Sequence, residues 1–78
     1  MQILAFGIAK DIFGNPTVEV DDNKVKTIHQ LKIFLEESYP RLSGLGSYIV
    51  ALNNEYASGN EAIKNGDELA IIPPVSGG

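Results

Sequence analysis

Cysteine is absent from all 78 residues of the sequence. Its absence excludes disulfide bonds, thiolate metal sites and a cysteine nucleophile. Histidine occurs once, at His29, and no carboxylate or nucleophile at a recognisable spacing accompanies it. We therefore interpret His29 as a surface residue rather than a catalytic base, and we predict no metal site.

Basic residues are few, and long apolar runs are missing. Six lysines and arginines against ten aspartates and glutamates give a net charge of −4. This balance argues against a nucleic-acid partner, which would need a basic patch, and it is compatible with a basic protein partner. No apolar run approaches the roughly 20 residues of a membrane span, and Met1 leads into an apolar segment without the features of a signal peptide. We therefore expect a cytoplasmic protein with no membrane partner.

The residues that are present predict one small domain. Apolar patterns predict strands at residues 1–7, 17–20, 48–52, 55–57 and 69–72. They predict one main helix at 27–39, single helical turns at 9–13 and 61–64, and a loop at 41–47. Two strands, one helix and then further strands are typical of an α+β domain with the helix on one face of the sheet.

The predicted main helix has recognisable ends and one apolar stripe. Thr27 and Gln30 fit a capping box, in which the Thr27 side chain accepts a hydrogen bond from the Gln30 N–H. Pro40 ends the helix. The stripe consists of Ile28, Leu31, Phe34, Leu35 and Tyr39. Its spacing indicates a helix packed on a sheet.

The first strand is apolar on both faces. This pattern fits a central strand in a covered sheet, and it also fits a strand whose second face meets a partner. By alternation, the sheet face opposite the helix holds Leu4, Phe6, Ala70 and Ile72, with Tyr56 extending it. An exposed apolar face of this kind usually marks an interface; the alternatives are that loops cover it or that it is a crystal contact.

The last six residues follow an apolar run and read Pro-Pro-Val-Ser-Gly-Gly. Proline has a fixed φ and no N–H, so Pro73 and Pro74 cannot continue a strand ladder. We therefore predict a folded domain at residues 1–72 and a flexible C-terminal tail at residues 73–78. Glycines without side chains allow the tip to enter a narrow passage, and the group that it presents is the α-carboxylate of Gly78.

Several segments together carry a family resemblance: the tail at 73–78, the turn and strand start at 66–69, the N-terminal segments at 3–7 and 10–14, and the turn at 52–55. In these segments the chain resembles the ubiquitin-like sulfur carriers of the MoaD/ThiS type, a family that includes the small subunit of molybdopterin synthase. The resemblance implies a β-grasp, ubiquitin-like fold. Such a fold has a mixed sheet of four to five strands, with the first and last strands parallel and central, and one main helix on one face.

The resemblance implies that the chain carries sulfur for molybdenum cofactor biosynthesis. An E1-like activating enzyme would use ATP to convert the Gly78 carboxylate to an acyl-adenylate, and a sulfur donor protein would convert that to a thiocarboxylate. In the synthase, the thiocarboxylate donates sulfur to a cyclic pterin monophosphate precursor and forms the dithiolene of molybdopterin. Both modifications are transient, and no cofactor is expected to be bound by the chain itself. Because cysteine is absent, no side chain can hold the sulfur, and the Gly78 carboxylate is the remaining place for it. The resemblance implies that the catalytic groups lie on the large subunit.

The resemblance also implies roles for the rest of the tail and for a partner surface. The residues implied to anchor, stiffen or thin the inserted tail are Pro73, Pro74, Val75, Ser76 and Gly77. The residues implied to contact partners are Phe6, Lys10, Tyr56 and Ile72. The implied partners are the large synthase subunit, in a heterotetramer of two small and two large subunits, the activating enzyme and the sulfur donor protein.

Departures from the family pattern are mild, and other functions stay open. The chain has Ser76 where alanine or cysteine is common, and Ile71 and Ile72 where aromatic residues are common. The alternatives are a sulfur carrier for thiamine or another sulfur-containing metabolite, a ubiquitin-like modifier that conjugates to lysines, and an interaction module whose terminal glycines are incidental.

Overall fold

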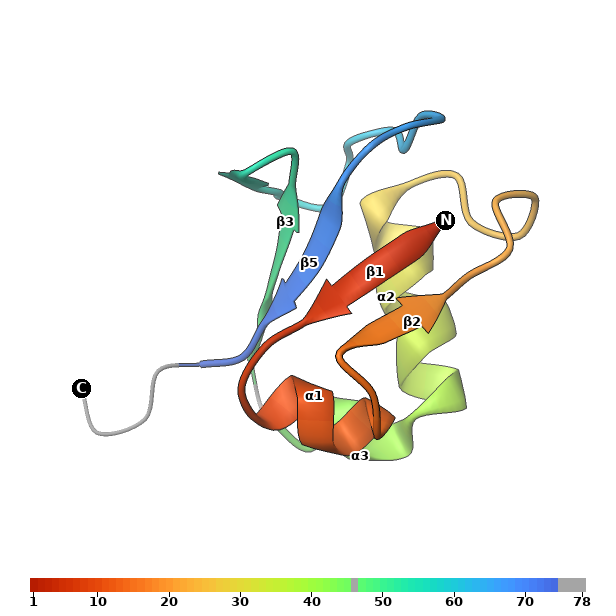
Figure 1. The fold of residues 1–78 in the computed structure, drawn as a ribbon. Coiled ribbons are helices and arrows are strands. Elements are labelled where there is room, and N and C mark those ends of the chain that lie inside the picture. Colours follow the sequence, from red (N-terminus) through yellow and green to blue (C-terminus); the bar gives the residue numbers. More distant parts are fainter. Residues whose placement is uncertain (46, 75–78) are drawn as a thin grey trace.

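The main helix covers one face of the sheet, and two short helices lie at one end of it (Figure 1). The structure is a computed structural model that describes residues 1–45 and 47–74. The strands are β1 (Gln2–Ala5), β2 (Thr17–Glu19), β3 (Ile49–Leu52), β4 (Glu55–Tyr56) and β5 (Leu69–Ile72). Their order is β2-β1-β5-β3-β4. β1 and β5 are parallel and the other neighbours are antiparallel, as predicted for a β-grasp.

Three helices are present in the described residues: α1 (Ile8–Phe13), α2 (Ile28–Ser38) and α3 (Pro40–Ser43). α2 is the main helix and packs on the sheet, while α1 and α3 close the end toward which β1 and β5 run (Figure 1). None of these helices has the length and hydropathy needed to cross a bilayer. The predicted α+β class, the main helix and the helical turn near residue 9 are confirmed.

Strand alternation separates a core face from an open face. Ile3 is fully buried and Ala5 nearly so, whereas Leu4 between them is 39% exposed. Leu69 and Ile71 of β5 are buried in the same way, and Leu69 lies beside Ile3 in the parallel ladder. Because side chains on a strand alternate between faces, one side of the sheet meets α2 and the other is left open.

The start of α2 is capped as the sequence predicts. The Thr27 Oγ1 accepts a hydrogen bond of 3.2 Å from the Gln30 N–H. The Gln30 side chain reaches back to the N–H of Lys26, at 2.7 Å, one residue earlier than in a standard capping box. Of the predicted stripe, Ile28, Leu31 and Leu35 are fully buried, while Phe34 and Tyr39 are half-buried and pack at the margin of the core.

The loop predicted at residues 41–47 is wrong in its first part, because α3 begins there. Pro40 stands at the first position of α3, where its missing N–H would have no partner in any case. The Leu42 side chain is fully buried, which gives this turn of helix an apolar anchor. The proline that stops one helix therefore also starts the next.

The helical turn predicted at residues 61–64 is also wrong. Ala62 forms an antiparallel bridge with Thr27, and the carbonyl of Glu61 accepts a 3.1 Å hydrogen bond from the Ile28 N–H. The carbonyl of Gly59 accepts another, of 2.9 Å, from the His29 N–H. The first N–H groups of a helix lack intrahelical partners. The Gly59 and Glu61 carbonyls supply these partners, so residues 61–64 do not form a helical turn.

Candidate functional site: the open sheet face and the root of the C-terminal arm

The C-terminal arm leaves from the end of β5, at the same end of the molecule as α1 and α3 (Figure 1). At its root, Pro73 is half-buried and Pro74 is exposed. Strand β5 ends at Ile72, directly before the first proline, as predicted. The predicted site residues Val75, Ser76, Gly77 and Gly78 lie outside the described residues, so the proposed sulfur-bearing carboxylate stays a prediction.

The root of the arm is held between two strands. On one side, the Phe6 N–H donates to the Ile71 carbonyl at 3.3 Å, which extends the β1–β5 ladder past the end of β1. On the other side, Ile72 pairs with Ile49 of β3. Pro73 has no N–H with which to extend either ladder. The arm therefore starts from the centre of the sheet.

A tight turn beside this root was not singled out by the sequence. The Ala9 N–H donates to the Phe6 carbonyl at 3.1 Å, and Gly7 between them has φ 55° and ψ −132°. These angles are those of the first central residue of a type II′ turn, a position that glycine dominates. A glycine placed between an apolar strand and a helical turn is the sequence signal that would have located it.

The open sheet face is apolar and exposed, which confirms the predicted alternation. The exposed fractions are 39% for Leu4, 51% for Phe6, 39% for Ile49 and 74% for Tyr56. Loops that covered this face would leave these side chains buried, so the alternative of a covered face is wrong. An exposed apolar group of this kind is typical of an interaction surface.

Strand register brings the predicted face residues together. Leu4 lies beside Ala70, Ala70 beside Ala51, and Ala51 beside Tyr56, so a continuous row crosses four strands. Sequence reasoning missed Ile49, whose place opposite Ile72 follows from the register of β3 and β5 and not from either strand alone. We name Leu4, Phe6, Ile49, Tyr56 and Ile72 the open-face cluster.

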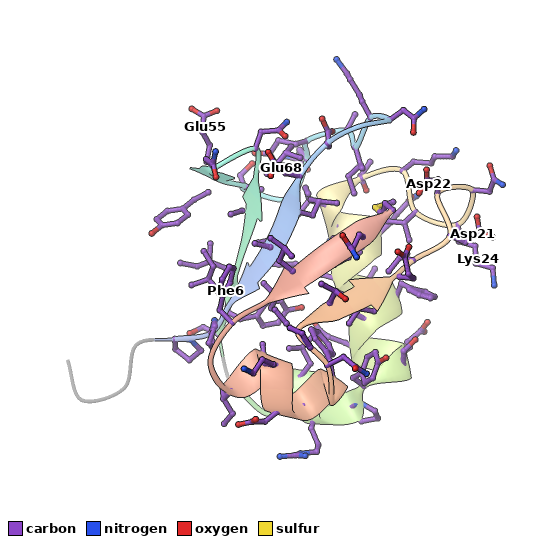
Figure 2. All side chains as sticks on the ribbon, in the orientation of Figure 1. Phe6, Asp21, Asp22, Lys24, Glu55 and Glu68 are labelled. Carbon is purple, nitrogen blue, oxygen red and sulfur yellow. The ribbon has the colours of Figure 1, made fainter. Side chains whose placement is uncertain are left out.

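The open-face cluster reaches the arm through Phe6 (Figure 2), whose side chain lies at the end of the sheet where the arm leaves. Ile8, at the start of α1, is 47% exposed close by in the chain and was also missed by sequence reasoning. Lys10 is exposed on the same short helix. The structure thus places Lys10 on the helix at the arm end of the molecule.

Charged side chains dominate the ends of the molecule away from the arm. Glu55 and Glu68 lie at the opposite end of the sheet from Phe6, and Asp21 and Asp22 lie in the loop after β2 (Figure 2). Lys24 lies beside the two aspartates in the same loop (Figure 2), so the far end carries charges of both signs. Such a face fits a partner with an apolar centre and a polar rim.

The perturbed carboxylates stabilise turns and do not point to catalysis. The pKa of Glu61 is lowered to about 2, first by hydrogen bonds from the Ser58 and Gly59 N–H groups. The pKa of Asp67 is lowered by the Asn53 side chain and by the Lys64 N–H. Both carboxylates hold loops at the end of the sheet away from the arm. In residues 1–45 and 47–74, no group of three His, Asp or Glu side chains is placed to hold a metal ion.

One pocket formed by the described residues also lies remote from the arm. It has a volume of about 730 Å³ and is lined by the starts of β1 and β5 and by the loop before β5, including Gln2, Ile63 and Leu69. Because β1 and β5 are parallel, their starts lie at the opposite end of the sheet from the arm. Within residues 1–45 and 47–74, the arm end therefore offers an exposed apolar face beside the exit of the chain.

The chain matches known proteins along nearly its whole length. Residues 3–78 match the family described as the ThiS family. A molybdopterin synthase sulfur carrier subunit from Dictyostelium discoideum is 38% identical over 81 residues, which cover 99% of this chain and 94% of that protein.

Two solved structures share the fold. SAMP1 from Haloferax volcanii has a TM-score of 0.80 and 34% identity, covering 99% of this chain and 97% of that one. The complex of subunits 1 and 2 of the molybdopterin-converting factor from Helicobacter pylori 26695 contains a chain with a TM-score of 0.70 and 26% identity, covering 99% of this chain and 96% of that one. The β-grasp assignment is thereby confirmed.

Proposed function

The chain belongs to the ThiS family, and on this premise we propose that it is a sulfur carrier that acts as the small subunit of molybdopterin synthase. The observation that carries the proposal is the match along nearly the whole chain to relatives named molybdopterin synthase sulfur carrier subunit. An exposed apolar face that reaches the root of the arm supports it.

The proposed chemistry takes place on the α-carboxylate of Gly78. Its pKa in an unfolded chain is about 3.5, so the group is ionised at neutral pH and is a poor electrophile. An activating enzyme joins it to the α-phosphate of ATP and releases pyrophosphate. Hydrosulfide supplied by a donor protein then attacks the acyl carbon and displaces AMP, which leaves a thiocarboxylate. In the synthase this group transfers its sulfur to the cyclic pterin monophosphate precursor.

The roles of the chain's own residues are docking and presentation. The open-face cluster, Lys10 and Ile8 would contact the partners, and the arm would carry Gly78 into their active sites. A stiff start at Pro73 and Pro74 lowers the ordering cost of insertion. The acids and bases of the reaction would belong to the partners.

The proposed partners are a large synthase subunit, an E1-like activating enzyme and a sulfur donor protein. The complex of the two subunits of the Helicobacter pylori molybdopterin-converting factor supports the first of these. We propose the same pairing here, in a heterotetramer of two small and two large subunits. The need for ATP supports a cytoplasmic location.

Intact-mass spectrometry tests the proposal. The protein is incubated with an activating enzyme, ATP and a sulfide source, and we expect a mass gain equal to one sulfur in place of one oxygen, on the peptide that ends at Gly78. A variant without Gly77 and Gly78 is the control and should gain nothing. Sulfur on an internal residue, or no gain with an activating enzyme that loads another family member, would contradict the proposal.

A second function is favoured by one observation. SAMP1, with a TM-score of 0.80, is a small archaeal modifier protein, so conjugation of Gly78 to lysines of other proteins is the alternative. Isopeptide-linked adducts found by mass spectrometry in cells that express the chain would support it. A sulfur carrier for thiamine would instead be revealed by a thiamine requirement in a deletion strain.

A further inference from the structure

We infer that Gly7 is a positioning residue: the space left by its missing side chain holds the ring of Pro73 and sets the direction in which the arm leaves the sheet. The inference rests on the proposed function, because it assigns Gly7 a part in delivering Gly78 to a partner.

The contact between Gly7 and Pro73 is close. A Cβ atom added to Gly7 would lie 3.1 Å from the Cγ of Pro73 and 4.0 Å from its Cδ. Carbon atoms in ordinary contact lie about 3.5–4.0 Å apart. With any side chain at position 7, either the turn or the proline ring has to move.

The position of Gly7 is fixed from both sides. Its turn is closed by the hydrogen bond from the Ala9 N–H to the Phe6 carbonyl, and Phe6 is in turn bonded to the Ile71 carbonyl. Behind the turn, Ala9 is fully buried. The turn therefore cannot easily retreat into the core, and the proline ring is the part that yields.

Displacement of the proline ring acts on everything that follows it. The proline ring contains the backbone nitrogen and holds φ fixed. A shift of the whole ring therefore moves the backbone and changes the direction of the chain. Because reaction rates are sensitive to displacements of about 1 Å, a small rotation at the root is enough to affect transfer from Gly78. The open-face cluster is not altered by this rotation, so docking persists.

The test compares Gly7→Ala with wild type as a substrate for the activating enzyme. We expect kcat for thiocarboxylate formation to fall about tenfold or more, since a displacement of ~1 Å can cost up to 10²-fold, while KM changes little. A fall in affinity with an unchanged kcat would overturn the inference, because it would make Gly7 part of the docking face.

Gly14→Ala is the matched control for backbone strain. Gly14 ends the same helix with φ 79°, and an added Cβ there meets nothing within 4 Å. The melting temperature should therefore fall in both variants, but kcat should fall only in Gly7→Ala. Equal losses of kcat in the two variants would overturn the inference and leave Gly7 with a structural role only.

A double variant separates the proline contact from the backbone strain of Gly7 itself. Pro73→Ala removes the Cγ and Cδ atoms that a Cβ at position 7 would meet. We expect Gly7→Ala to lower kcat much less when combined with Pro73→Ala than it does alone. An undiminished effect in the Pro73→Ala background would show that the ring is not the atom group that transmits the change.

A measurement on the unreacted protein separates this inference from the proposed function. We expect nuclear Overhauser effects between the Gly7 α-protons and the Pro73 ring γ-protons in solution. Their absence would overturn the inference even if sulfur loading succeeds. Their presence in a chain that never accepts sulfur would instead overturn the proposed function while the contact itself stands.

Discussion

At the residue scale, two apolar side chains in and directly after β1 have opposite roles. Ile3 is fully buried in the core, and Phe6 is 51% exposed on the open face. Their difference comes from the alternation of side chains along the extended chain, since both are large and apolar. The same substitution should therefore affect stability at one position and binding at the other.

Phe6→Asp should weaken binding to the large subunit strongly and leave the isolated protein folded. A charge that becomes buried in an interface without a partner costs several kcal/mol, whereas on the free surface it stays hydrated. Titration calorimetry with the large subunit and thermal melting of the free protein measure the two effects. Ile72→Asp should behave in the same way.

Two control variants make the comparison specific. Ile3→Asp should unfold the protein, because it puts the charge in the core. Ile33→Asp should change neither property, since Ile33 is 46% exposed but belongs to α2 on the other side of the sheet. If Phe6→Asp also unfolds the isolated protein, the assignment of Phe6 to the open face is contradicted.

At the element scale, the start of α2 depends on the loop at residues 58–61. The Glu61 carboxylate accepts hydrogen bonds of 2.8 Å from the Ser58 and Gly59 N–H groups. The Gly59 and Glu61 carbonyls accept in turn from the first N–H groups of α2. One acidic side chain therefore shapes the loop that completes the helix N-terminus.

Stability should fall in acid partly through Glu61. Its folded-state pKa of about 2 lies below the ordinary value of 4.5. Its contribution to stability is therefore fully present above pH 4.5 and is lost as the pH falls through 2. Glu61→Gln should lower the free energy of unfolding at pH 7 and flatten its dependence on pH between these values.

Urea denaturation at a series of pH values measures this effect. Glu55→Gln is the control, since its carboxylate accepts no hydrogen bond within the part of the chain that the structure describes. The control should keep the acid dependence of the wild type. An unchanged pH profile in Glu61→Gln would contradict the assigned role.

Most elements could be predicted from local patterns, and most of the errors involve contacts between segments that are distant in sequence. The strands, α2 and its cap follow from apolar spacing and from Thr27 and Gln30. The conformation of residues 61–64 could not be predicted in this way. It depends on hydrogen bonds with the start of α2, which is distant in sequence. Ile49 and Gly7 were missed for the same reason: the contacts that define their roles, with Ile72 and Pro73, depend on strand register and on the return of the chain.

At the scale of the whole molecule, the folded body and the arm are separable. All of the buried apolar residues in the described part of the chain lie between Ile3 and Ile71. Deleting Gly77 and Gly78 should therefore leave the melting temperature nearly unchanged and abolish sulfur loading. A large loss of thermal stability, measured by calorimetry, would contradict the division at residue 72.

The reach of the arm should matter separately from its chemistry. One glycine appended after Gly78 keeps a glycine carboxylate of the same intrinsic pKa but moves it by up to ~3.5 Å. We expect normal folding and normal binding to the large subunit, with slow adenylation and little pterin product. Adenylation rates compared at matched binding test this, and near-normal turnover would show that partner sites do not measure arm length.

The central position of β5 also determines how the molecule responds to mechanical force. β5 is paired with β1 on one side and with β3 on the other, up to the residue where the arm begins. Tension on the arm, such as a partner or an unfolding machine would apply, pulls along β5 and across the hydrogen bonds of both ladders. These bonds then share the load in shear and do not open one at a time. The arm can therefore be drawn into a narrow site while the body that docks it stays folded.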